Sequence, residues 1–354
     1  MQLTIQKTQC PKAKPQDESQ LGFGKLFTDH MFIMNYTEGQ GWHDARIVPY
    51  GAFDMDPAAM VLHYGQAIFE GMKAYRRPDG QIQLFRPMEN LKRFNRSAAR
   101  LCIPAIDEEE VLGFLKELIR LEQDWVPHSE GTSLYIRPTA VAMDPQLGVH
   151  VSKTYIFFII LSPVGAYYAE GLKPVKILVE DEYVRSVRGG MGFAKAAGNY
   201  ACSLIADSTA QAHGCAQVLW LDGVERKYVE EVGSMNIFFK IGGKLITPPL
   251  GGSILGGITR KSVLELAPKL GYEVCEDRLS IQEIFDAQQN GTLEEVFGTG
   301  TAAVISPVGG LVWEDKEIAI NGGEMGPCAQ AIYDALTGIQ FGTQPDSMGW
   351  TMLL

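Results

Sequence analysis

The 354-residue chain lacks the features that mark several specialised classes of protein. Its longest apolar run, Tyr155 to Leu161, is far shorter than the roughly 20 residues that cross a bilayer, so it predicts a buried strand. Its six cysteines favour a reduced, cytoplasmic setting with buried thiols. They are scattered, with no close pair of the kind found in metal knuckles and redox motifs (Cys10, Cys102, Cys202, Cys215, Cys275 and Cys328).

Other absences argue against export and against nucleic acids as partners. The segment from Met1 to Glu18 contains no apolar core that a secretory machinery recognises, so we expect no export. The formal net charge of −11 disfavours a binder of phosphate backbones, because such proteins concentrate Lys and Arg. No repeat or low-complexity tract is present. What remains is an ordinary globular composition, with 46% hydrophobic and 21% charged residues.

Residue patterns predict a mixture of strands and helices. Strands are expected at Phe32–Tyr36, Ile82–Phe85, Ser133–Pro138, Val151–Leu161, Val175–Glu180, Gln217–Leu221 and Asn236–Lys240. Helices are expected at Met88–Arg100, after Asp107 with three glutamates in the first turn, from about Gly198 to His213, and from Ser280 to Asn290-Gly291. The last of these has a capping box formed by Ser280 and Glu283. This alternation has no strict βαβ rhythm, which predicts an α+β or mixed α/β fold.

The chain length favours two domains, since single cores stop growing at about 250–300 residues. The segment from Ser162 to Lys173 carries Pro, Gly and Ala without periodicity, which indicates an interdomain connection with its boundary near Glu170. We therefore expect a smaller α/β domain at 1–165, a linker at 166–175 and a larger domain at 176–354.

Three glycine-bearing loops in the second half could present backbone N–H groups to an anion. Gly251–Gly257 leads into a helix that starts at Ile258 and ends near Leu270. Gly298–Thr301 follows a strand-like segment, and Arg188–Lys195 ends on a lysine. Taken singly, such loops are more often plain connectors, and a lone lysine is more often a solvated surface group. Lys195, however, has only small neighbours, which leave room for a bulky ligand, and burial of its ammonium lowers the pKa as Schiff-base chemistry requires.

The order and spacing of several motifs resemble the branched-chain amino-acid aminotransferases, which are class IV pyridoxal-phosphate enzymes. The resemblance runs from about Phe23 to Gly342. Its motifs are Leu62–Tyr75, Leu84–Pro87, Thr132–Pro138, Lys195–Tyr200, Gln217–Trp220, Glu231–Asn236, Thr247–Leu250 and Phe297–Ala302. It implies the two-domain fold type IV, similar to D-amino-acid aminotransferase, with pyridoxal 5′-phosphate bound by the larger domain, and a homodimer.

The resemblance also implies roles toward the cofactor. Lys195 matches the lysine that carries the cofactor and moves the substrate α-proton. Glu231 matches the carboxylate that keeps the pyridine nitrogen protonated, although by itself it could be a surface group next to Glu230. Spacing alone does not select Arg93, which could equally lie on a solvated helix face. Tyr200 is expected to contact the ring O3′, and Ser234 belongs to the Glu231 motif. The residues expected to bind the phosphate are Arg93, Ile258, Thr259, Thr301 and, less directly, Arg185.

For the substrate, the resemblance implies that Tyr135 and the backbone around Thr301 and Ala302 receive the α-carboxylate. Arg137 is expected to meet the distal carboxylate of glutamate, a pairing that suits guanidinium geometry. Phe23, Phe69 and Tyr167 are expected to line an apolar pocket, with Tyr64 of the partner subunit and with Lys73 nearby. By composition alone, these aromatic residues are more often core.

The expected reaction is the reversible transfer of the amino group of L-leucine, L-isoleucine or L-valine to 2-oxoglutarate by a ping-pong mechanism, as in amino-acid biosynthesis. The rivals are a D-amino-acid aminotransferase, an aminodeoxychorismate lyase and a non-catalytic ligand-binding relative. The Tyr135-Ile136-Arg137 motif and the chain length argue against the first two, and the retained cofactor residues argue against the third. Ala303 and Ser306 stand where animal relatives carry a redox-active Cys pair, so we expect a bacterial-type cytoplasmic enzyme without thiol regulation at that place.

Overall fold

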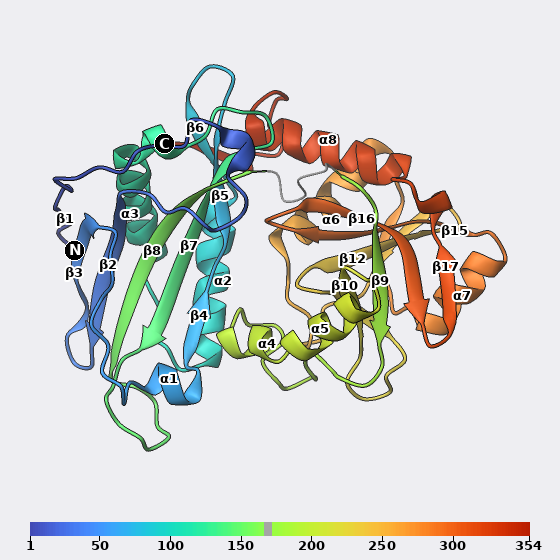
Figure 1. Cartoon of the computed structure of the whole chain (residues 1–354), viewed down its shortest axis with the longest axis horizontal. Coiled ribbons are helices and arrows are strands. Elements are labelled where there is room, and N and C mark those ends of the chain that lie inside the picture. The colour runs from blue at the N-terminus through green and yellow to red at the C-terminus, as the bar shows by residue number, and fades with distance from the viewer. Residues whose placement is uncertain (166–171) are drawn as a thin grey trace. The chain divides into compact units, whose positions relative to one another are not determined.

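The computed structural model describes residues 1–165 and 172–354, which form two compact units (Figure 1). The first unit holds the described residues of Met1–Ala169 together with Ala194–Gly198 and Gly338–Leu354. The second unit holds the described residues of Glu170–Phe193 and the segment Asn199–Thr337. None of the helices in the described residues combines the length and apolarity that a membrane span requires.

The first unit is built on one largely antiparallel sheet in the order β1-β3-β2-β8-β7-β5-β6-β18, with β4 paired to β7. Its longest ladder joins β7 to β8 and runs from Ser133 opposite Val164 to Ala142 opposite Tyr155. The strands are β1 (Thr4–Ile5), β2 (His30–Thr37), β3 (Gly41–Pro49), β4 (Ala67–Phe69), β5 (Met72–Arg76), β6 (Ile82–Phe85), β7 (Ser133–Ala142), β8 (Thr154–Val164) and β18 (Thr351–Leu353).

Two amphipathic helices, α2 (Pro87–Arg100) and α3 (Glu108–Leu121), pack on this sheet (Figure 1). Their buried residues, among them Phe94 and Leu115, join Phe157 of β8 in one hydrophobic core. Asp107 caps α3 by accepting a hydrogen bond from the Glu110 N–H at 2.9 Å. The other helical elements of this unit are α1 (Met60–Tyr64) and 3-10 turns at Glu18–Gln20 and Gln123–Trp125.

The second unit contains a mixed sheet in the order β11-β10-β9-β16-β15-β12-β13-β14, with β17 paired to β16. Strand β9 is parallel to both of its neighbours, and β13 is parallel to β14. The strands are β9 (Val175–Glu180), β10 (Gln217–Leu221), β11 (Val229–Val232), β12 (Asn236–Ile241), β13 (Lys244–Thr247), β14 (Val274–Glu276), β15 (Leu293–Gly300), β16 (Val304–Trp313) and β17 (Lys316–Ala319).

Helix α5 (Leu204–Ala212) packs on β10, where Ala206 and Ala210 meet the buried Trp220. The other helical elements are α4 (Ala197–Ala201), α6 (Ile258–Leu266), α7 (Ile281–Gln289), α8 (Pro327–Phe341) and 3-10 turns at Ala267–Leu270 and Asn321–Gly323. The mixed sheets with packed helices confirm the expected α+β fold.

Three expected elements differ from the structure. The helix expected from Gly198 to His213 is interrupted between α4 and α5, where the Ser203 hydroxyl donates to the Tyr200 carbonyl at 2.9 Å and competes with helical bonding. The expected strand Val151–Leu161 begins later and continues to Val164, so part of the expected connection is strand β8. Residues Gly298 to Gly300, expected as a loop, continue strand β15.

Other expectations are confirmed by the observed elements. The strand at Val175–Glu180 has the predicted bounds, and the capping box between Ser280 and Glu283 is present at the start of α7. The domain boundaries 1–165, 166–175 and 176–354 stay a prediction, and the boundary residue Glu170 lies outside the described residues. The structure adds that the C-terminal strand β18 pairs with β6 and so belongs to the first unit.

Candidate active site

Lys195 belongs to the first unit, where its backbone is held by β4 and α2. The Lys195 N–H donates to the Ser97 hydroxyl at 2.8 Å, and the Lys195 carbonyl accepts from the Phe69 N–H at 3.1 Å. Ala196 forms a β-bridge with Ile68. The Lys195 ammonium lies 4.7 Å from the centre of the Phe69 ring. Desolvation and then the Arg93 charge lower the pKa of Lys195 to about 8, so about a tenth of its amine is neutral at pH 7, far more than for an ordinary lysine.

A buried ion pair between Glu70 and Arg93 lies next to Lys195. The two carboxylate oxygens of Glu70 accept from Arg93 Nε at 2.7 Å and from Arg93 Nη2 at 2.8 Å. Asn90 also donates to Glu70, at 2.8 Å. Burial favours the neutral form of Glu70, but the charges of Arg93 and Lys195 outweigh it and hold the pKa of Glu70 below its ordinary value. Arg93 is buried, so the interpretation as a solvated helix face is wrong.

Glu70 received no role from the sequence, although it lies inside the motif Leu62–Tyr75. The sequence gives little indication of a role for Glu70, because its partner Arg93 is 23 residues away and a single carboxylate in an apolar segment does not reveal that partner. The bidentate geometry fixes the guanidinium of Arg93 in one orientation. Glu70 is therefore a positioning residue for Arg93 and a negative charge in the field that Lys195 experiences.

Tyr135 and Arg137 alternate on β7 and lie together. Arg137 Nη2 donates to the Tyr135 hydroxyl at 3.1 Å, and the Arg137 guanidinium lies 4.7 Å from the Phe69 ring centre. The Phe23 ring meets the Tyr135 ring edge-on at 4.9 Å. The Tyr135 phenol occupies the place that a side chain on Gly71 would take, since a Cβ there would come within 2.1 Å of its oxygen. Both Tyr135 and Arg137 contribute to the field at Lys195.

The remaining expected substrate residues of the first unit have different environments. Lys73 lies directly opposite Tyr135 in the pairing of β5 with β7, so the two side chains share one face of the sheet. Burial lowers the pKa of Lys73 to about 8. Tyr64 is 41% exposed on α1, and its hydroxyl donates to the Leu147 carbonyl. Tyr167 lies outside the described residues.

A second cluster forms around Glu231 in the second unit. Arg185 Nε donates to Glu231 at 2.5 Å, Arg185 Nη2 pairs with the same carboxylate, and Asn236 Nδ2 donates to its other oxygen at 3.2 Å. Arg185 Nη2 also donates to the Gly192 carbonyl at 3.0 Å. Burial raises the pKa of Glu231 to about 7, while Arg185 favours the charged form. Glu231 is buried, so the alternative of a surface carboxylate is wrong.

Four of the expected cofactor residues line one small cavity of the second unit, about 20 Å³ in volume (Arg185, Tyr200, Glu231 and Ser234). The ion pair with Glu231 gives Arg185 a partner that the sequence did not indicate. Its expected contact with a phosphate stays a prediction. Glu231 and Tyr200 therefore border a common space within this unit.

The start of α6 offers the backbone donors that the sequence predicted. Gly257 occupies the N-cap position, and no side chain caps the helix, so its first N–H groups have no partner within the helix. Ile258 and Thr259, the first two residues of α6, are buried. A side chain on Gly257 would come within 2.0 Å of the Asn236 side-chain oxygen, so the loop can follow this course only with glycine. Thr301 and Ala302 directly follow β15.

The sequence and the fold of the chain match those of known proteins. The family model described as amino-transferase class IV matches residues 67–311. The chain is 58% identical to branched-chain-amino-acid aminotransferase 2 of Bacillus subtilis (strain 168) over 349 residues, which are 99% of this chain and 96% of the relative.

Two solved structures have a similar fold. The branched-chain amino acid aminotransferase of Escherichia coli matches with a TM-score of 0.75 and 30% identity, over 90% of this chain and 98% of that one. The branched-chain aminotransferase of the thermophilic archaeon Thermoproteus uzoniensis with norvaline matches with a TM-score of 0.74 and 28% identity, over 92% of this chain and 99% of that one. The chain therefore belongs to the class IV aminotransferases and, within them, to the branched-chain-amino-acid aminotransferases.

Proposed function

We propose that this chain is a pyridoxal 5′-phosphate enzyme that reversibly transfers the amino group of L-leucine, L-isoleucine or L-valine to 2-oxoglutarate. The observation that carries the proposal is the environment of Lys195. Its pKa is lowered to about 8 by desolvation and by Arg93, and it lies within residues 67–311, which match the class IV family model. Such a lysine supplies the neutral amine that covalent catalysis on a carbonyl requires.

The described residues fit the proposed cofactor. The uncapped start of α6, with Ile258 and Thr259, offers N–H donors to a phosphate, and the close approach of Gly257 to Asn236 leaves that backbone uncovered by a side chain. Arg93, oriented by Glu70, supplies a guanidinium of the kind that phosphates prefer. We propose that Thr301 joins this phosphate site.

On the ring side, we propose that Glu231 faces the pyridine nitrogen and that Tyr200 contacts the ring O3′, with Ser234 beside them. The burial of Glu231 and its place beside Tyr200 and Ser234 in the second unit support this assignment. The contact between Arg185 and Glu231 favours a role for Arg185 in holding that carboxylate, because the guanidinium charge opposes protonation of Glu231.

When bound, pyridoxal 5′-phosphate supplies a carbonyl that takes up the amino group and a ring that accepts the electrons left by the departing α-proton. The protein's own residues then hold and move protons. Lys195 removes the proton at the substrate α-carbon in its neutral form and returns it on the other side of the reaction. Glu231, when ionised, keeps the ring nitrogen protonated. Both half-reactions use the same residues, which gives the ping-pong order.

Substrate recognition in the proposal rests on the cluster around Tyr135. We assign the α-carboxylate to Tyr135 and to the backbone at Thr301 and Ala302. Arg137 is assigned to the distal carboxylate of 2-oxoglutarate or glutamate, and its buried Nε has no hydrogen-bond partner among the described residues. A buried donor without a partner is costly, so a ligand oxygen at this guanidinium compensates for that cost.

The apolar part of the substrate site is assigned to Phe23 and Phe69, whose rings flank Tyr135 and Arg137. Lys73 shares the sheet face of Tyr135 and adds a buried amine there. We also assign Tyr167 and Tyr64 of the partner subunit to this pocket, within a cytoplasmic homodimer. Light scattering of the purified protein tests the dimer, and a monomer at working concentration contradicts it.

Amino-acid specificity tests the proposed reaction against a D-amino-acid aminotransferase. We expect turnover of L-leucine, L-isoleucine and L-valine with 2-oxoglutarate, measured by the glutamate formed, and no turnover of D-alanine. Turnover of D-alanine alone rejects the proposal in favour of that rival. Release of pyruvate from aminodeoxychorismate without an amino acceptor supports the lyase instead.

An absorption spectrum tests whether the chain is a catalyst or only a ligand-binding relative. The purified protein is expected to show a band near the edge of the visible range that borohydride abolishes, with the reduced cofactor found on the Lys195 peptide by mass spectrometry. The Lys195→Ala variant is expected to lose both the covalent label and the activity. A protein that stays colourless with added cofactor rejects the enzyme proposal.

A further inference from the structure

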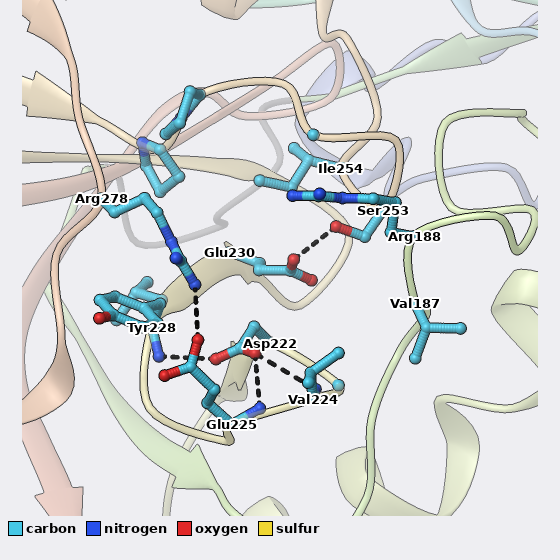
Figure 2. A pocket seen from close by; sticks show the side chains of 15 residues that line it. Val187, Arg188, Asp222, Val224, Glu225, Tyr228, Glu230, Ser253, Ile254 and Arg278 are labelled. Carbon is cyan, nitrogen blue, oxygen red and sulfur yellow. Dashed lines mark hydrogen bonds and ion pairs between the residues drawn. The ribbon is translucent and has the colours of Figure 1, made fainter.

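A second and larger cavity lies in the second unit, outside the groups assigned to the reaction (Figure 2). Its volume is about 360 Å³, within the roughly 300–1,000 Å³ typical of small-molecule sites. The turn between β10 and β11 forms one wall, and the segment from Pro248 to Ile254 forms another. Val187, Arg188 and Arg278 complete the lining.

Most of the charged groups in this cavity are already used. Asp222 accepts backbone N–H groups of the turn that follows it, including those of Glu225 at 2.8 Å and Tyr228 at 2.9 Å. Arg278 lies 3.5 Å from the centre of the Tyr228 ring and pairs with Glu225 at 3.5 Å. These contacts shape the wall and leave Glu230 and Arg188 as the groups available to a ligand.

Glu230 has one satisfied oxygen and one open oxygen. The Ser253 hydroxyl donates to Oε1, while Oε2 makes no hydrogen bond with the described residues. Burial raises the pKa of Glu230, so its charged form gains from a cation in the cavity. Arg188 forms no hydrogen bond or ion pair within the described chain, and its side chain lies along Gly251 and Gly252. In the view of Figure 2, the Glu230 carboxylate lies between Arg278 and Arg188.

The rest of the lining is suited to an apolar group. Val187, Val224 and Ile254 belong to it, together with the prolines Pro248 and Pro249. Val224 is 82% exposed and Val187 is 40% exposed, so both present apolar surface that the chain itself leaves uncovered. One carboxylate, one free guanidinium and an apolar wall are the complement of a zwitterion with an apolar side chain.

We propose that this cavity is a second binding site, which takes a free L-α-amino acid with an apolar side chain as an effector. Glu230 receives the ammonium group, Arg188 receives the carboxylate, and Val224 and Ile254 contact the side chain. The site is distinct from the proposed catalytic groups and does not depend on the proposed reaction.

Two short connections join this cavity to the cluster around Glu231. Glu230 and Glu231 are neighbours on β11, so their side chains leave opposite faces of the strand. Ser253, which donates to Glu230, has its carbonyl oxygen so near Gly192 that a Cβ there would come within 1.9 Å. The Gly192 carbonyl in turn accepts from Arg185, the partner of Glu231. These contacts are the route by which a ligand at Glu230 would act on the Arg185–Glu231 pair.

Calorimetric titration of the borohydride-treated protein with L-α-methylleucine tests the proposal. This probe has no α-hydrogen to transfer, and reduction blocks Lys195 if it carries the cofactor. If the protein carries no cofactor, reduction does nothing, so the titration is informative whatever the outcome for the proposed function. We expect one site per chain. 4-Methylvalerate lacks the ammonium and 3-methylbutylamine lacks the carboxylate, and each is expected to bind at least about tenfold more weakly.

Substitutions in the cavity test whether the probe binds there. Glu230→Gln and Arg188→Gln are each expected to weaken binding of L-α-methylleucine by about tenfold or more. Arg226→Gln, which changes an exposed arginine of the same turn whose Nη1 donates to the Asp181 carbonyl at 3.1 Å, is the matched control and is expected to bind normally. No binding to the reduced wild-type protein, equal binding of all three probes, or binding unchanged in both variants overturns the proposal.

Discussion

At the scale of single residues, Lys195 lies between opposing charges. Arg93 lowers the pKa of Lys195, whereas Glu70 raises it, and desolvation adds the largest downward contribution. The buried pair of Glu70 and Arg93 therefore has two consequences, because it orients a guanidinium and moderates the basicity of the neighbouring amine. Neither consequence requires Glu70 itself to touch a substrate.

The lowered pKa of Lys195 predicts a pH dependence of cofactor uptake. Only the neutral amine attacks an aldehyde, so the rate at which cofactor-free protein takes up pyridoxal 5′-phosphate is expected to rise with pH and to be half-maximal near pH 8. Stopped-flow absorbance measures this rate. A midpoint near the ordinary lysine value of 10.5 contradicts the expectation.

The pH dependence of cofactor uptake in two variants tests whether the charge of Glu70 affects the pKa of Lys195. Glu70→Gln removes a charge that raises the pKa of Lys195, so the midpoint is expected to move to lower pH. Glu38→Gln removes an exposed carboxylate whose one ion pair among the described residues is with Lys153 at 3.3 Å, and the midpoint is expected to stay in place. Equal midpoints in the two variants contradict a role for Glu70 at Lys195.

The absence of a side chain at Gly71 makes room for the Tyr135 phenol. A Cβ at this position would come within 2.1 Å of the Tyr135 hydroxyl oxygen, so Gly71→Ala displaces the phenol. We expect kcat/KM for L-leucine to fall by about tenfold to a hundredfold, since a misplaced contact group has effects of this size. Steady-state assays measure it.

Gly113→Ala is the matched control for that substitution. Gly113 lies within α3, and an added Cβ would meet no atom of the described residues within 4 Å beyond its chain neighbours and the helix backbone. Alanine also favours helix by roughly 0.5–1 kcal/mol. Activity is therefore expected to stay unchanged and stability to stay equal or rise. If Gly71→Ala retains full kcat/KM, the Tyr135 phenol has no role in binding the substrate.

At the scale of elements, local patterns predicted most of the α-helices but fewer than half of the strands that the described residues form, and long-range contacts decided the exceptions. Strand β9 and the start of α7 follow from side chains within a few residues of one another. Gly298 and Gly300 were expected in a loop because glycine usually marks turns. They continue β15 instead because the Met235 side chain packs over both, 3.0 Å from the positions of their absent Cβ atoms. No local pattern reveals that contact.

The candidate site was predictable to a similar extent. The family motifs gave Lys195, Glu231, Arg93 and Arg185, but neither Glu70, which orients Arg93, nor the pairing of Arg185 with Glu231. Such partners come from other elements, and their pairing depends on how the strands and helices are packed. Composition records the presence of Glu70 and Arg185 without showing what they touch.

The capping box of α7 gives a prediction at this scale. Three hydrogen bonds join Ser280 and Glu283: the Ser280 N–H and hydroxyl donate to the Glu283 carboxylate at 2.8 Å and 2.7 Å, and the Glu283 N–H donates to the hydroxyl at 3.2 Å. Ser280→Ala removes both bonds of the hydroxyl and is expected to cost about 1 kcal/mol of unfolding free energy. Urea denaturation measures it. Gln282→Ala, which removes an exposed contact to Asp286, is the control and is expected to cost only about 0.3 kcal/mol. Equal losses in both variants contradict a stabilising role for the cap.

At the scale of the whole molecule, the proposed cofactor residues are divided between the two units. Lys195, Glu70 and Arg93 belong to the first unit, whereas Tyr200 and Glu231 belong to the second. The chain passes from the first unit to the second between Gly198 and Asn199, so only a short segment separates Lys195 from Tyr200. Under the proposed function, cofactor binding stabilises each unit that contributes a contacting residue, because the ligand binds the folded form of that unit.

This division predicts the pattern of hydrogen exchange on cofactor binding. Adding pyridoxal 5′-phosphate to cofactor-free protein is expected to slow exchange in β4 and α2 of the first unit and also in β11 and the start of α6 of the second, as followed by mass spectrometry of peptides. At a hundredfold excess over the dissociation constant, the added protection against unfolding is expected to be about 2.7 kcal/mol. Helix α7 contains none of the proposed cofactor residues and serves as the internal control for local protection. Protection confined to one unit contradicts the division of roles, because a cofactor that contacts only Lys195 and Arg93 leaves Glu231 and Tyr200 without a function in the reaction.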